Sequence, residues 1–286
     1  MKTTQKELAE KFLGYHLEED VLLLVNAWDA GSARLVAATG AKAIATTSMG
    51  VAASLGYPDC QAISVREMAD AIGRIVNAVS LPVTADIEAG YGSDLKEILA
   101  SVNMLVSTGI VGGNVEDSYQ RSPDLVDADA FCERIAAIRA LTDSLGFHFV
   151  INTRTDVFLN KSGDPETRLA ETIRRGNKYR AAGADCVFVP DVWEEEKIRV
   201  LVNEIDAPIN ILVNPTNGTG LPPSVARLKE LGVARVSFGS AVMKATLALT
   251  KKIVEEATMH GTYEVLANSV NPIPETLKAY QMATTV

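Results

Sequence analysis

The sequence predicts an α/β fold, a (β/α)8 (TIM) barrel with an extra C-terminal helical segment. Aliphatic and β-branched runs of strand length recur eight times, and the segments between them carry apolar residues at the helical period of i, i+3, i+4 and i+7. Several helical segments end in glycine just before the next run, as in STGIVGG and AAGADCV, because glycine enters the left-handed region at a helix end without steric cost. Eight strands, each followed by a helix, form a closed barrel. The runs are residues 21–26, 41–47, 82–87, 109–116, 147–154, 184–190, 208–214 and 234–239.

A doubly wound open sheet would show the same alternation of strands and helices. Such a sheet usually has a glycine-rich phosphate loop after its first strand, but that position here reads NAWDAGS, which favours the barrel. Residues 1–258 are therefore predicted to form one catalytic barrel domain. Residues 259–286 remain after eight units and are expected to form a helical tail that packs on the barrel or on a neighbouring subunit.

The composition is typical of a globular α/β enzyme, with 47% hydrophobic residues among 286 and a net charge of -9. Basic residues form no patch that would bind nucleic acid or an anionic membrane, and no apolar run approaches the roughly 20 residues that cross a bilayer. The three cysteines are widely spaced and the N-terminus lacks an apolar signal core, so a cytoplasmic location is expected. An anionic substrate would need a local cation in so acidic a chain.

Three acidic residues follow two neighbouring predicted strands. Asp86 and Glu88 come after LPVTA, and Glu116 follows the next strand along the chain. One such residue alone is usually a helix cap or a solvated charge, but three converging carboxylates repel one another unless a cation or protons neutralise them. Oxygen ligands without nearby histidine or cysteine favour Mg²⁺, with Mn²⁺ as the alternative ion.

Polar residues at the ends of two other strands could bind an anion. Arg154, in INTRTD, could hold a substrate carboxylate with two hydrogen bonds, or could instead bridge Asp156 or Glu116 in a structural role. Thr47 and Ser48 offer hydroxyls and N–H groups to an oxyanion, although both residue types are common helix caps. The long segment 48–64 is expected to be a loop on the active-site face.

The motifs NAWDAGSARL, TTSMGVAASLGYPD, ADIEAGYG, NVEDS and NTRTD, in this order and spacing from about residue 24 to about residue 245, resemble the isocitrate lyase and phosphoenolpyruvate mutase superfamily. The resemblance implies a (β/α)8 barrel, a magnesium ion and small 2-oxo carboxylic acid substrates. It also implies an enolate that the metal stabilises while a C–C or P–C bond is made or broken. Members often exchange the last helix with a neighbour, so a homodimer or homotetramer is expected.

The resemblance also assigns roles to the acidic residues. Asp86 is similar to the principal metal ligand, and Glu88 and Glu116 would complete the shell directly or through water. Many relatives have aspartate at the position of Glu88, so the side chain here is longer by one methylene. Asp59, in LGYPD, resembles the aspartate that lies beside the metal and serves in the chemistry of some branches, which makes it a candidate catalytic residue.

The same resemblance extends to the substrate-binding residues. Arg154 is similar to the arginine that grips the substrate carboxylate and is a second catalytic candidate. Thr47 and Ser48 match the carboxylate-binding turn, and Asp191 and Asn214, from later loops, are weaker binding candidates.

The segment YQRSPDLVDADAF, where relatives carry a gating loop, departs from the family pattern. Isocitrate and methylisocitrate lyases have a KKCGH or KRCGH motif there, whereas Cys132 of this chain falls in the following helix and is expected to be a buried thiol. Phosphoenolpyruvate mutases place lysine and asparagine in this loop, where this chain has Arg121 and Ser122. Residues 117–128 are expected to close over the site.

Three functional hypotheses follow. The leading one is a magnesium-dependent lyase that acts through a metal-stabilised enolate on a small 2-oxo or 2-hydroxy di- or tricarboxylic acid, with decarboxylation of an oxaloacetate-like compound favoured because no lyase cysteine is present. The second is a mutase or hydrolase of phosphonopyruvate type, to which only Arg121 points. The third is a protein that binds a 2-oxo acid without catalysis.

Overall fold

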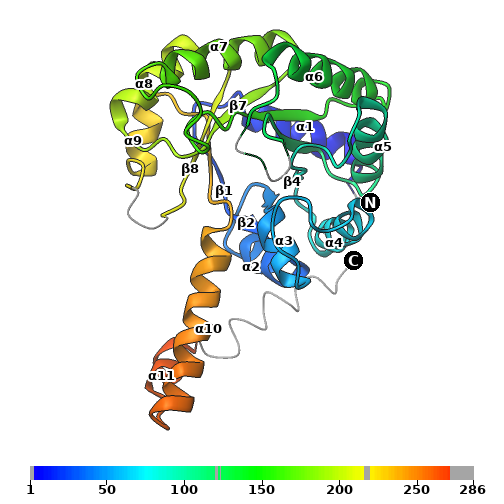
Figure 1. The fold of residues 1–286 in the computed structure, drawn as a ribbon. Coiled ribbons are helices and arrows are strands. Elements are labelled where there is room, and N and C mark those ends of the chain that lie inside the picture. The colour runs from blue at the N-terminus through cyan, green and yellow to red at the C-terminus, as the bar shows by residue number, and fades with distance from the viewer. Residues whose placement is uncertain (1–2, 120–121, 123, 216–219, 271–286) are drawn as a thin grey trace.

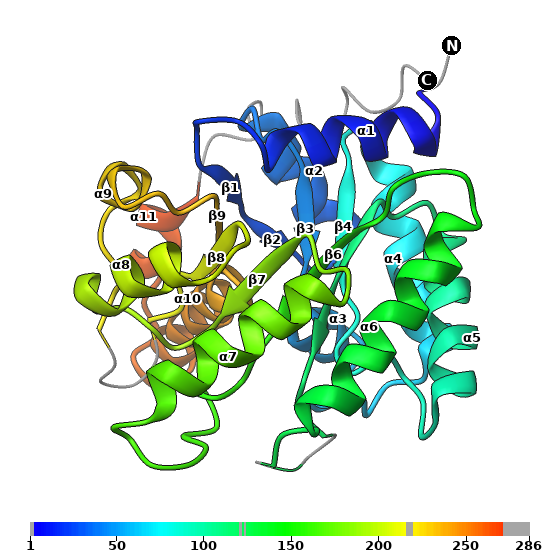
Figure 2. The same ribbon diagram turned by 90° about the horizontal axis from the view of Figure 1, so that it is seen from above.

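The computed structural model describes residues 3–119, 122, 124–215 and 220–270. Its strands are all parallel and lie in the order β1-β9-β8-β7-β6-β5-β4-β3-β2, which confirms the predicted barrel. The ring closes because β1 and β2 are two parts of one strand, separated by Val25 alone (Figures 1 and 2). The strands are β1 Leu22–Leu24, β2 Asn26–Ala27, β3 Ile44–Thr46, β4 Val83–Asp86, β5 Gly112–Glu116, β6 Val150–Arg154, β7 Cys186–Val189, β8 Ile209–Leu212 and β9 Arg235–Ser237.

The interruption of the first strand is held by the Asn26 side chain. Its Oδ1 accepts hydrogen bonds from the backbone N–H groups of Phe238 at 2.8 Å and Gly239 at 2.9 Å, and its Nδ2 donates to the carbonyl of Thr46 at 2.7 Å. The run 21–26, predicted as one strand, therefore pairs with β9 through its first part and with β3 through its last part. The backbone pairing of the first strand changes from β9 to β3 at this point. The buried amide of Asn26 bridges the change, because it bonds to the chain after β9 and to the end of β3.

Helices follow the strands in alternation, as predicted. One difference is that the segment 48–64, expected to be a loop, begins with the short helix α3, for which Thr47 is the N-cap. The helices are α1 Gln5–Tyr15, α2 Ala30–Ala38, α3 Ser48–Ser54, α4 Val65–Ala78, α5 Leu95–Val106, α6 Ala128–Asp143, α7 Arg168–Ala181, α8 Glu195–Glu204, α9 Val225–Glu230, α10 Ala241–Met259 and α11 Glu264–Ser269.

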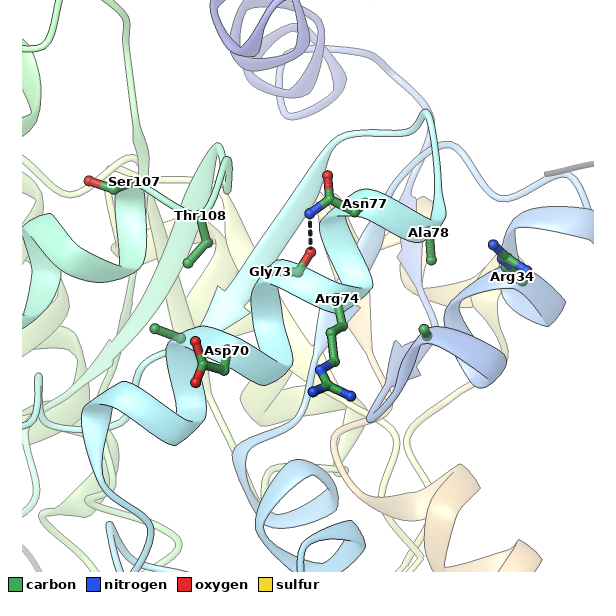
Figure 3. A pocket seen from close by; sticks show the side chains of 10 residues that line it. Arg34, Asp70, Gly73, Arg74, Asn77, Ala78, Ser107 and Thr108 are labelled. Carbon is green, nitrogen blue, oxygen red and sulfur yellow. Dashed lines mark hydrogen bonds between the residues drawn. The ribbon is translucent and has the colours of Figure 1, made fainter. Parts of the chain in front are cut away.

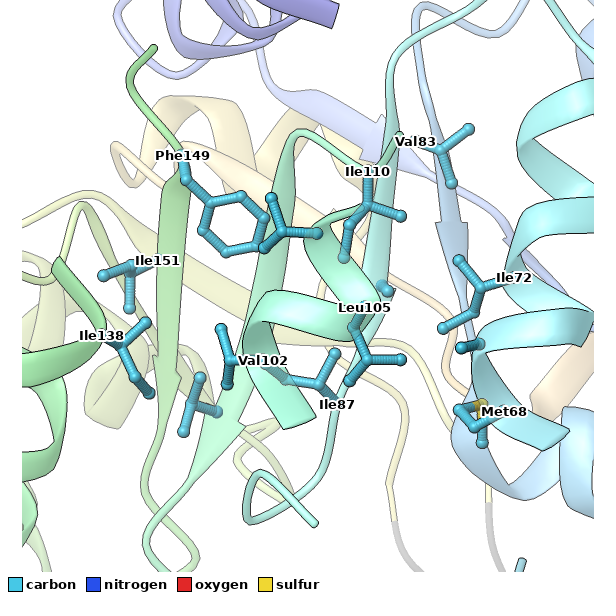
Figure 4. Packing of buried hydrophobic residues seen from close by; sticks show 14 of the residues in the cluster. Met68, Ile72, Val83, Ile87, Val102, Leu105, Ile110, Ile138, Phe149 and Ile151 are labelled. Atoms are coloured by element: carbon cyan, nitrogen blue, oxygen red, sulfur yellow. The ribbon is translucent and has the colours of Figure 1, made fainter. Parts of the chain in front are cut away.

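The hydrophobic core lies between the strands and the surrounding helices, as Figure 4 shows for β4 to β6 against α4 to α6. A second cluster packs α1 on the barrel, with Phe12 buried against Leu22, Val111 and Val150. These three residues lie at or just before the first residues of their strands, so α1 covers the N-terminal end of the barrel. The C-terminal end is left for a site, as is usual in such barrels.

Helix α10 runs away from the barrel and carries α11 at its far end (Figure 1). Met243 is the one buried residue reported along its 19 residues. The segment that leaves the barrel thus begins at residue 241, and α10 crosses the boundary expected between residues 258 and 259. Residues 271–286 of the expected tail lie outside the described residues, and its packing on a neighbouring subunit stays a prediction. Among the described helices, none combines the length and the apolar character that a membrane span requires.

Candidate active site

A cavity of about 280 Å³ opens at the C-terminal end of the strands. One wall is apolar and includes Leu159, Phe188 and Trp193. The cavity is also lined by polar residues. Seven of them are predicted site residues: Thr47, Ser48, Asp59, Asp86, Arg154, Asp191 and Asn214. The structure therefore brings together residues from five segments of the chain. The other two predicted residues, Glu88 and Glu116, are not among the lining residues.

Asp86 ends β4 with its carboxylate on the cavity. Its Oδ2 accepts two hydrogen bonds from Ser48, one from the hydroxyl at 2.6 Å and one from the backbone N–H at 3.1 Å. The backbone N–H of Asp86 donates to Thr46 Oγ1 at 3.0 Å. The carboxylate is thus fixed through one oxygen, while Oδ1 makes no hydrogen bond to the described residues. Ser48, expected to meet the substrate, directs both donors to Asp86 instead.

Glu88 is buried and has a left-handed backbone, with φ 50°. Its Oε1 accepts a hydrogen bond from the Tyr91 hydroxyl at 2.6 Å, and its Oε2 accepts one from the backbone N–H of Gln61 at 2.8 Å. The pKa of Glu88 is raised to about 7, chiefly by burial and also by the charges of Asp86 and Asp59, against the lowering effect of the two hydrogen bonds. Glu88 therefore loses its charge near neutral pH unless a cation lies nearby.

Glu116 and Arg154 end adjacent strands as register partners and form an ion pair, with 2.9 Å between Oε2 and Nη1. Arg154 also binds Asp156 with two bonds, from Nε at 2.5 Å and from Nη2 at 2.9 Å. The structural bridge considered as the alternative role for Arg154 is therefore present, and to both acids. Two of its five N–H donors make hydrogen bonds to Asp156, a third group lies in the ion pair with Glu116, and Arg154 still lines the cavity.

The pKa of Glu116 is raised well above its usual range because burial disfavours the carboxylate. Arg154 opposes this shift, whereas the negative charges of Asp156 and Asp86 add to it. Repulsion from the charge of Asp86 helps to raise the pKa of both Glu88 and Glu116. The three predicted metal ligands are thus close enough to repel one another.

Residues 3–119, 122, 124–215 and 220–270 contain no group of three histidine, cysteine, aspartate or glutamate side chains placed to enclose a metal ion. Mg²⁺ does not require such a cage, since it usually keeps several waters and binds one or two carboxylates. The free oxygen of Asp86 suits a direct bond, and the crowded charges of Glu88 and Glu116 suit contact through water. The donor set therefore fits Mg²⁺ bound directly by Asp86, with Glu88 and Glu116 in contact through water rather than as direct ligands.

Three further predicted residues border the cavity. Burial raises the pKa of Asp59, Asp86 raises it further, and the backbone of Cys60 and the charges of Arg154 and Lys244 lower it. Asp191 has φ 64°, and burial raises its pKa as well. The buried Oδ1 of Asn214 makes no hydrogen bond within the described part of the chain, so a ligand donor could satisfy it.

The segment 117–128, expected to close over the site, is anchored at its base. Asp117 is fully buried, and its Oδ2 accepts hydrogen bonds from the Tyr179 hydroxyl at 2.6 Å and from Arg175 at 3.1 Å. Arg121 lies outside the described residues, and Ser122 donates from its hydroxyl to Asp124 at 3.0 Å. Closure of this segment stays a prediction.

Sequence reasoning missed several residues that line the cavity. Asn26 and Asn114 lie in the motifs NAWDAGS and NVEDS, where an amide inside an apolar strand run was an available signal. No spacing rule places Trp193 or Lys244 there, because they come from a loop and from the start of α10. Cys132, expected to be a buried thiol, is half-buried on α6, and burial raises its pKa.

A wider hollow of about 720 Å³ lies on the outside of the barrel between α2, α4 and the end of α5 (Figure 3). Arg34, Asp70 and Arg74 line it, and the Asn77 side chain donates to the carbonyl of Gly73 at 2.8 Å. It contains none of the predicted site residues and does not lie at the C-terminal ends of the strands. The smaller cavity at the strand ends is therefore the candidate site.

The sequence model of the family described as Phosphoenolpyruvate phosphomutase matches residues 12–258. An uncharacterized protein of Mycobacterium tuberculosis (strain H37Rv) is 35% identical over 237 residues, which cover 82% of this chain and 84% of that protein. The 2-methylisocitrate lyase of Halalkalibacterium halodurans is 28% identical over 269 residues, which cover 91% of this chain and 85% of the enzyme.

Among solved structures, a crystal structure from Burkholderia cenocepacia J2315 is similar to this one along almost its whole length. That protein, classed only provisionally as a lyase or mutase, has 33% sequence identity and a TM-score of 0.89. The match covers 97% of each chain. The sequence and the fold thus point to the same family.

Proposed function

We propose that this chain, which belongs to the phosphoenolpyruvate mutase/isocitrate lyase superfamily, is a magnesium-dependent carbon–carbon lyase of small 2-oxo or 2-hydroxy di- or tricarboxylic acids. The observation that carries the proposal is the Asp86 carboxylate, fixed through one oxygen by Ser48 and free at the other, on a cavity of about 280 Å³. A cavity at the lower end of the size range for ligand sites suits a small acid.

Bound magnesium would supply positive charge to offset the negative charge that develops on the substrate oxygens as a C–C bond breaks. Asp86 would hold the ion, and Ser48 would keep the carboxylate in one orientation. The N–H groups of Arg154 that make no hydrogen bond to Asp156 could donate to a substrate carboxylate.

Two other side chains are placed to complete the site. Asn214 brings a buried Oδ1 without a partner among the described residues, and that oxygen can accept a hydrogen bond from a substrate hydroxyl. Asp59 has a raised pKa, so its carboxyl can hold a proton closer to neutral pH than an ordinary aspartate. The apolar lining residues Leu159, Phe188 and Trp193 would limit the access of water to a bound substrate.

No cysteine occurs among the lining residues of the cavity in the described part of the chain. This composition favours cleavages that need an electron sink more than an acid, such as decarboxylation of an oxaloacetate-like compound. The similarity to 2-methylisocitrate lyase supports C–C chemistry in general. A second candidate is P–C chemistry on a phosphonate, which the description of the matching family supports.

The test is an assay of oxaloacetate, 2-methylisocitrate and phosphonopyruvate, each with Mg²⁺ and each with a chelator. The proposal predicts turnover of at least one of the two carboxylic acids and its loss in the chelator. Turnover of phosphonopyruvate alone would overturn C–C cleavage in favour of the second candidate. Tight Mg²⁺-dependent binding of these acids without turnover would instead support a protein that binds 2-oxo acids without catalysis.

We also propose that α10 and α11 pack on a neighbouring copy of the chain. Large apolar side chains are exposed along them, with Leu247 54%, Val254 53% and Met259 73% accessible. A helix that leaves its own barrel with such a face gains stability by burying it elsewhere. Analytical ultracentrifugation should give a dimer or tetramer for the full chain and a smaller species for Leu247→Asp. A monomeric full chain at micromolar concentration would contradict this proposal.

A further inference from the structure

The described lining of the cavity contains two cationic side chains, Arg154 and Lys244. Arg154 is already paired with Glu116 and Asp156, so two carboxylates offset its charge. Lys244 forms no ion pair within the described part of the chain and lies in the first turns of α10, where its backbone N–H donates to Ser240. Lys244 is therefore the cation of the cavity whose charge the described residues leave available to a ligand.

The remaining charges of the lining are negative. Asp59, Asp86 and Asp191 all border the cavity, so a substrate with two carboxylates would meet repulsion at the end that the metal site does not serve. The positive charge of Lys244 lies near enough to Asp59 to lower the pKa of that residue. A second substrate carboxylate beside Lys244 would find the attraction that the rest of this wall lacks.

We propose that Lys244 binds the second carboxylate of the substrate and makes the site selective for dicarboxylic acids over monocarboxylic acids of the same length. The inference rests on the proposed function, because it takes the first carboxylate to be held by Arg154 and by the magnesium ion that Asp86 would bind. A lysine ammonium is a compact charge on a flexible stem and can reach the second carboxylate of acids of different length. Lys244 is exposed, so water weakens its attraction for a carboxylate and we expect a moderate contribution.

The test is a calorimetric titration of the full chain in Mg²⁺ with pyruvate, phosphonopyruvate, malate and 2-hydroxybutyrate. The last two acids have equal chain length and differ in the second carboxylate. The wild type should bind malate more tightly than 2-hydroxybutyrate. Lys244→Met should weaken malate binding about tenfold, the loss of one charge-assisted hydrogen bond, and leave pyruvate and 2-hydroxybutyrate unchanged. Lys244→Arg should retain most of the preference.

Lys252→Met is the matched control, since it removes the same charge from an exposed position on the same helix, outside the cavity. If Lys244→Met weakens the binding of malate and 2-hydroxybutyrate equally, or changes neither, the inference is overturned. The proposed function would still stand in that case if the wild type binds pyruvate. Absence of Mg²⁺-dependent pyruvate binding in the wild type would overturn the proposed function itself and the inference with it. Phosphonopyruvate bound more tightly than malate, and weakened by Lys244→Met, would overturn the assignment of a carboxylate to this position.

Discussion

Ser48 donates two hydrogen bonds to a single oxygen of Asp86, from its hydroxyl at 2.6 Å and from its backbone N–H at 3.1 Å. The first turn of α3 thus holds the carboxylate at the end of β4 in one orientation. The other oxygen makes no hydrogen bond within the described part of the chain, and Asp86 lines the cavity. A carboxylate prepared in this way loses little freedom when it binds an ion, which is the usual effect of residues that orient metal ligands.

Ser48→Ala removes the shorter of these bonds and leaves the backbone one. We expect the affinity for Mg²⁺ to fall about tenfold, because the Asp86 carboxylate can then rotate. Calorimetric titration of Mg²⁺ checks the prediction. Ser54→Ala, on the same helix, is the control, since its hydroxyl donates only to the carbonyl of Val51. Equal Mg²⁺ affinity in the two variants would contradict the orienting role.

Glu88→Gln should stabilise the metal-free protein at alkaline pH. The pKa of Glu88 is raised from 4.5 to about 7 in the folded protein, so folding favours the protonated form. The ionised Glu88 side chain lowers the free energy of unfolding. This destabilisation is absent below pH 4.5, grows between pH 4.5 and 7, and stays at about 3 kcal/mol above pH 7. Glutamine carries no charge and avoids it. Thermal unfolding in a chelator, from pH 4.5 to 8, measures the difference.

The same variant should bind Mg²⁺ more weakly than the wild type, since it lacks one negative charge near the ion. Glu133→Gln, at an exposed position on α6, serves as the control for both measurements. If the stability gained by Glu88→Gln over the wild type is no larger at pH 8 than at pH 4.5, the pKa of Glu88 is not raised in the folded protein.

Arg154→Lys keeps a positive charge but loses the planar fork that makes two hydrogen bonds to Asp156 at the edge of the cavity. The dissociation constant of pyruvate should rise ten- to a hundredfold, the range expected for a charge-assisted hydrogen bond. Mg²⁺ affinity should change much less. Arg174→Lys, at a surface pair with Glu171, is the control. Unchanged pyruvate affinity would assign Arg154 a purely structural role.

His16 should make the protein less stable in moderate acid. Its pKa is lowered from 6.5 to about 4, chiefly by burial and then by the charge of Arg235, against the hydrogen bond with the carbonyl of Phe12 and the charge of Asp185. The contribution of neutral His16 to the free energy of unfolding is fully present above pH 6.5. It falls by about 3 kcal/mol as the pH is lowered toward 4.

As the pH is lowered across this range, the free energy of unfolding should therefore fall more steeply for the wild type than for His16→Asn. Chemical denaturation at each pH measures it. His260→Asn removes an exposed histidine at the end of α10 and should retain the steep wild-type dependence. Parallel curves for the wild type and His16→Asn would show that His16 titrates alike in the folded and unfolded chain.

The sequence was enough to predict that most of the candidate residues gather at one end of the barrel, because in a parallel barrel every strand points the same way. Residues that follow apolar runs, such as Asp86 and Arg154, must then meet at one end. The pairing of the side chains could not be predicted from the period of a strand, which fixes the face of a residue and not its partner. Glu88 lies near enough to Asp86 for the two charges to repel, as expected, but its left-handed backbone and its hydrogen bond from Tyr91 do not follow from that period.

The parts missed by sequence reasoning depend on contacts distant along the chain. Asn26 acts through Phe238 and Gly239, which meet it only when the barrel closes. Lys244 reaches the cavity because α10 begins at the strand end before it departs, and a helical period says nothing of such a departure. The short helix α3 carries the residues SMGVAAS, which read as loop because they lack a polar face.

The central claim is that Asp86 holds a magnesium ion to which a small oxyacid binds. Its most direct test is calorimetric titration of oxalate into the wild type and Asp86→Ala, each with and without Mg²⁺, with thermal unfolding as the check on the fold. The account predicts that the wild type binds oxalate only when Mg²⁺ is present, and that Asp86→Ala stays folded but binds neither Mg²⁺ nor oxalate. Oxalate binding of equal strength in the two proteins, or in the wild type without the ion, would contradict it.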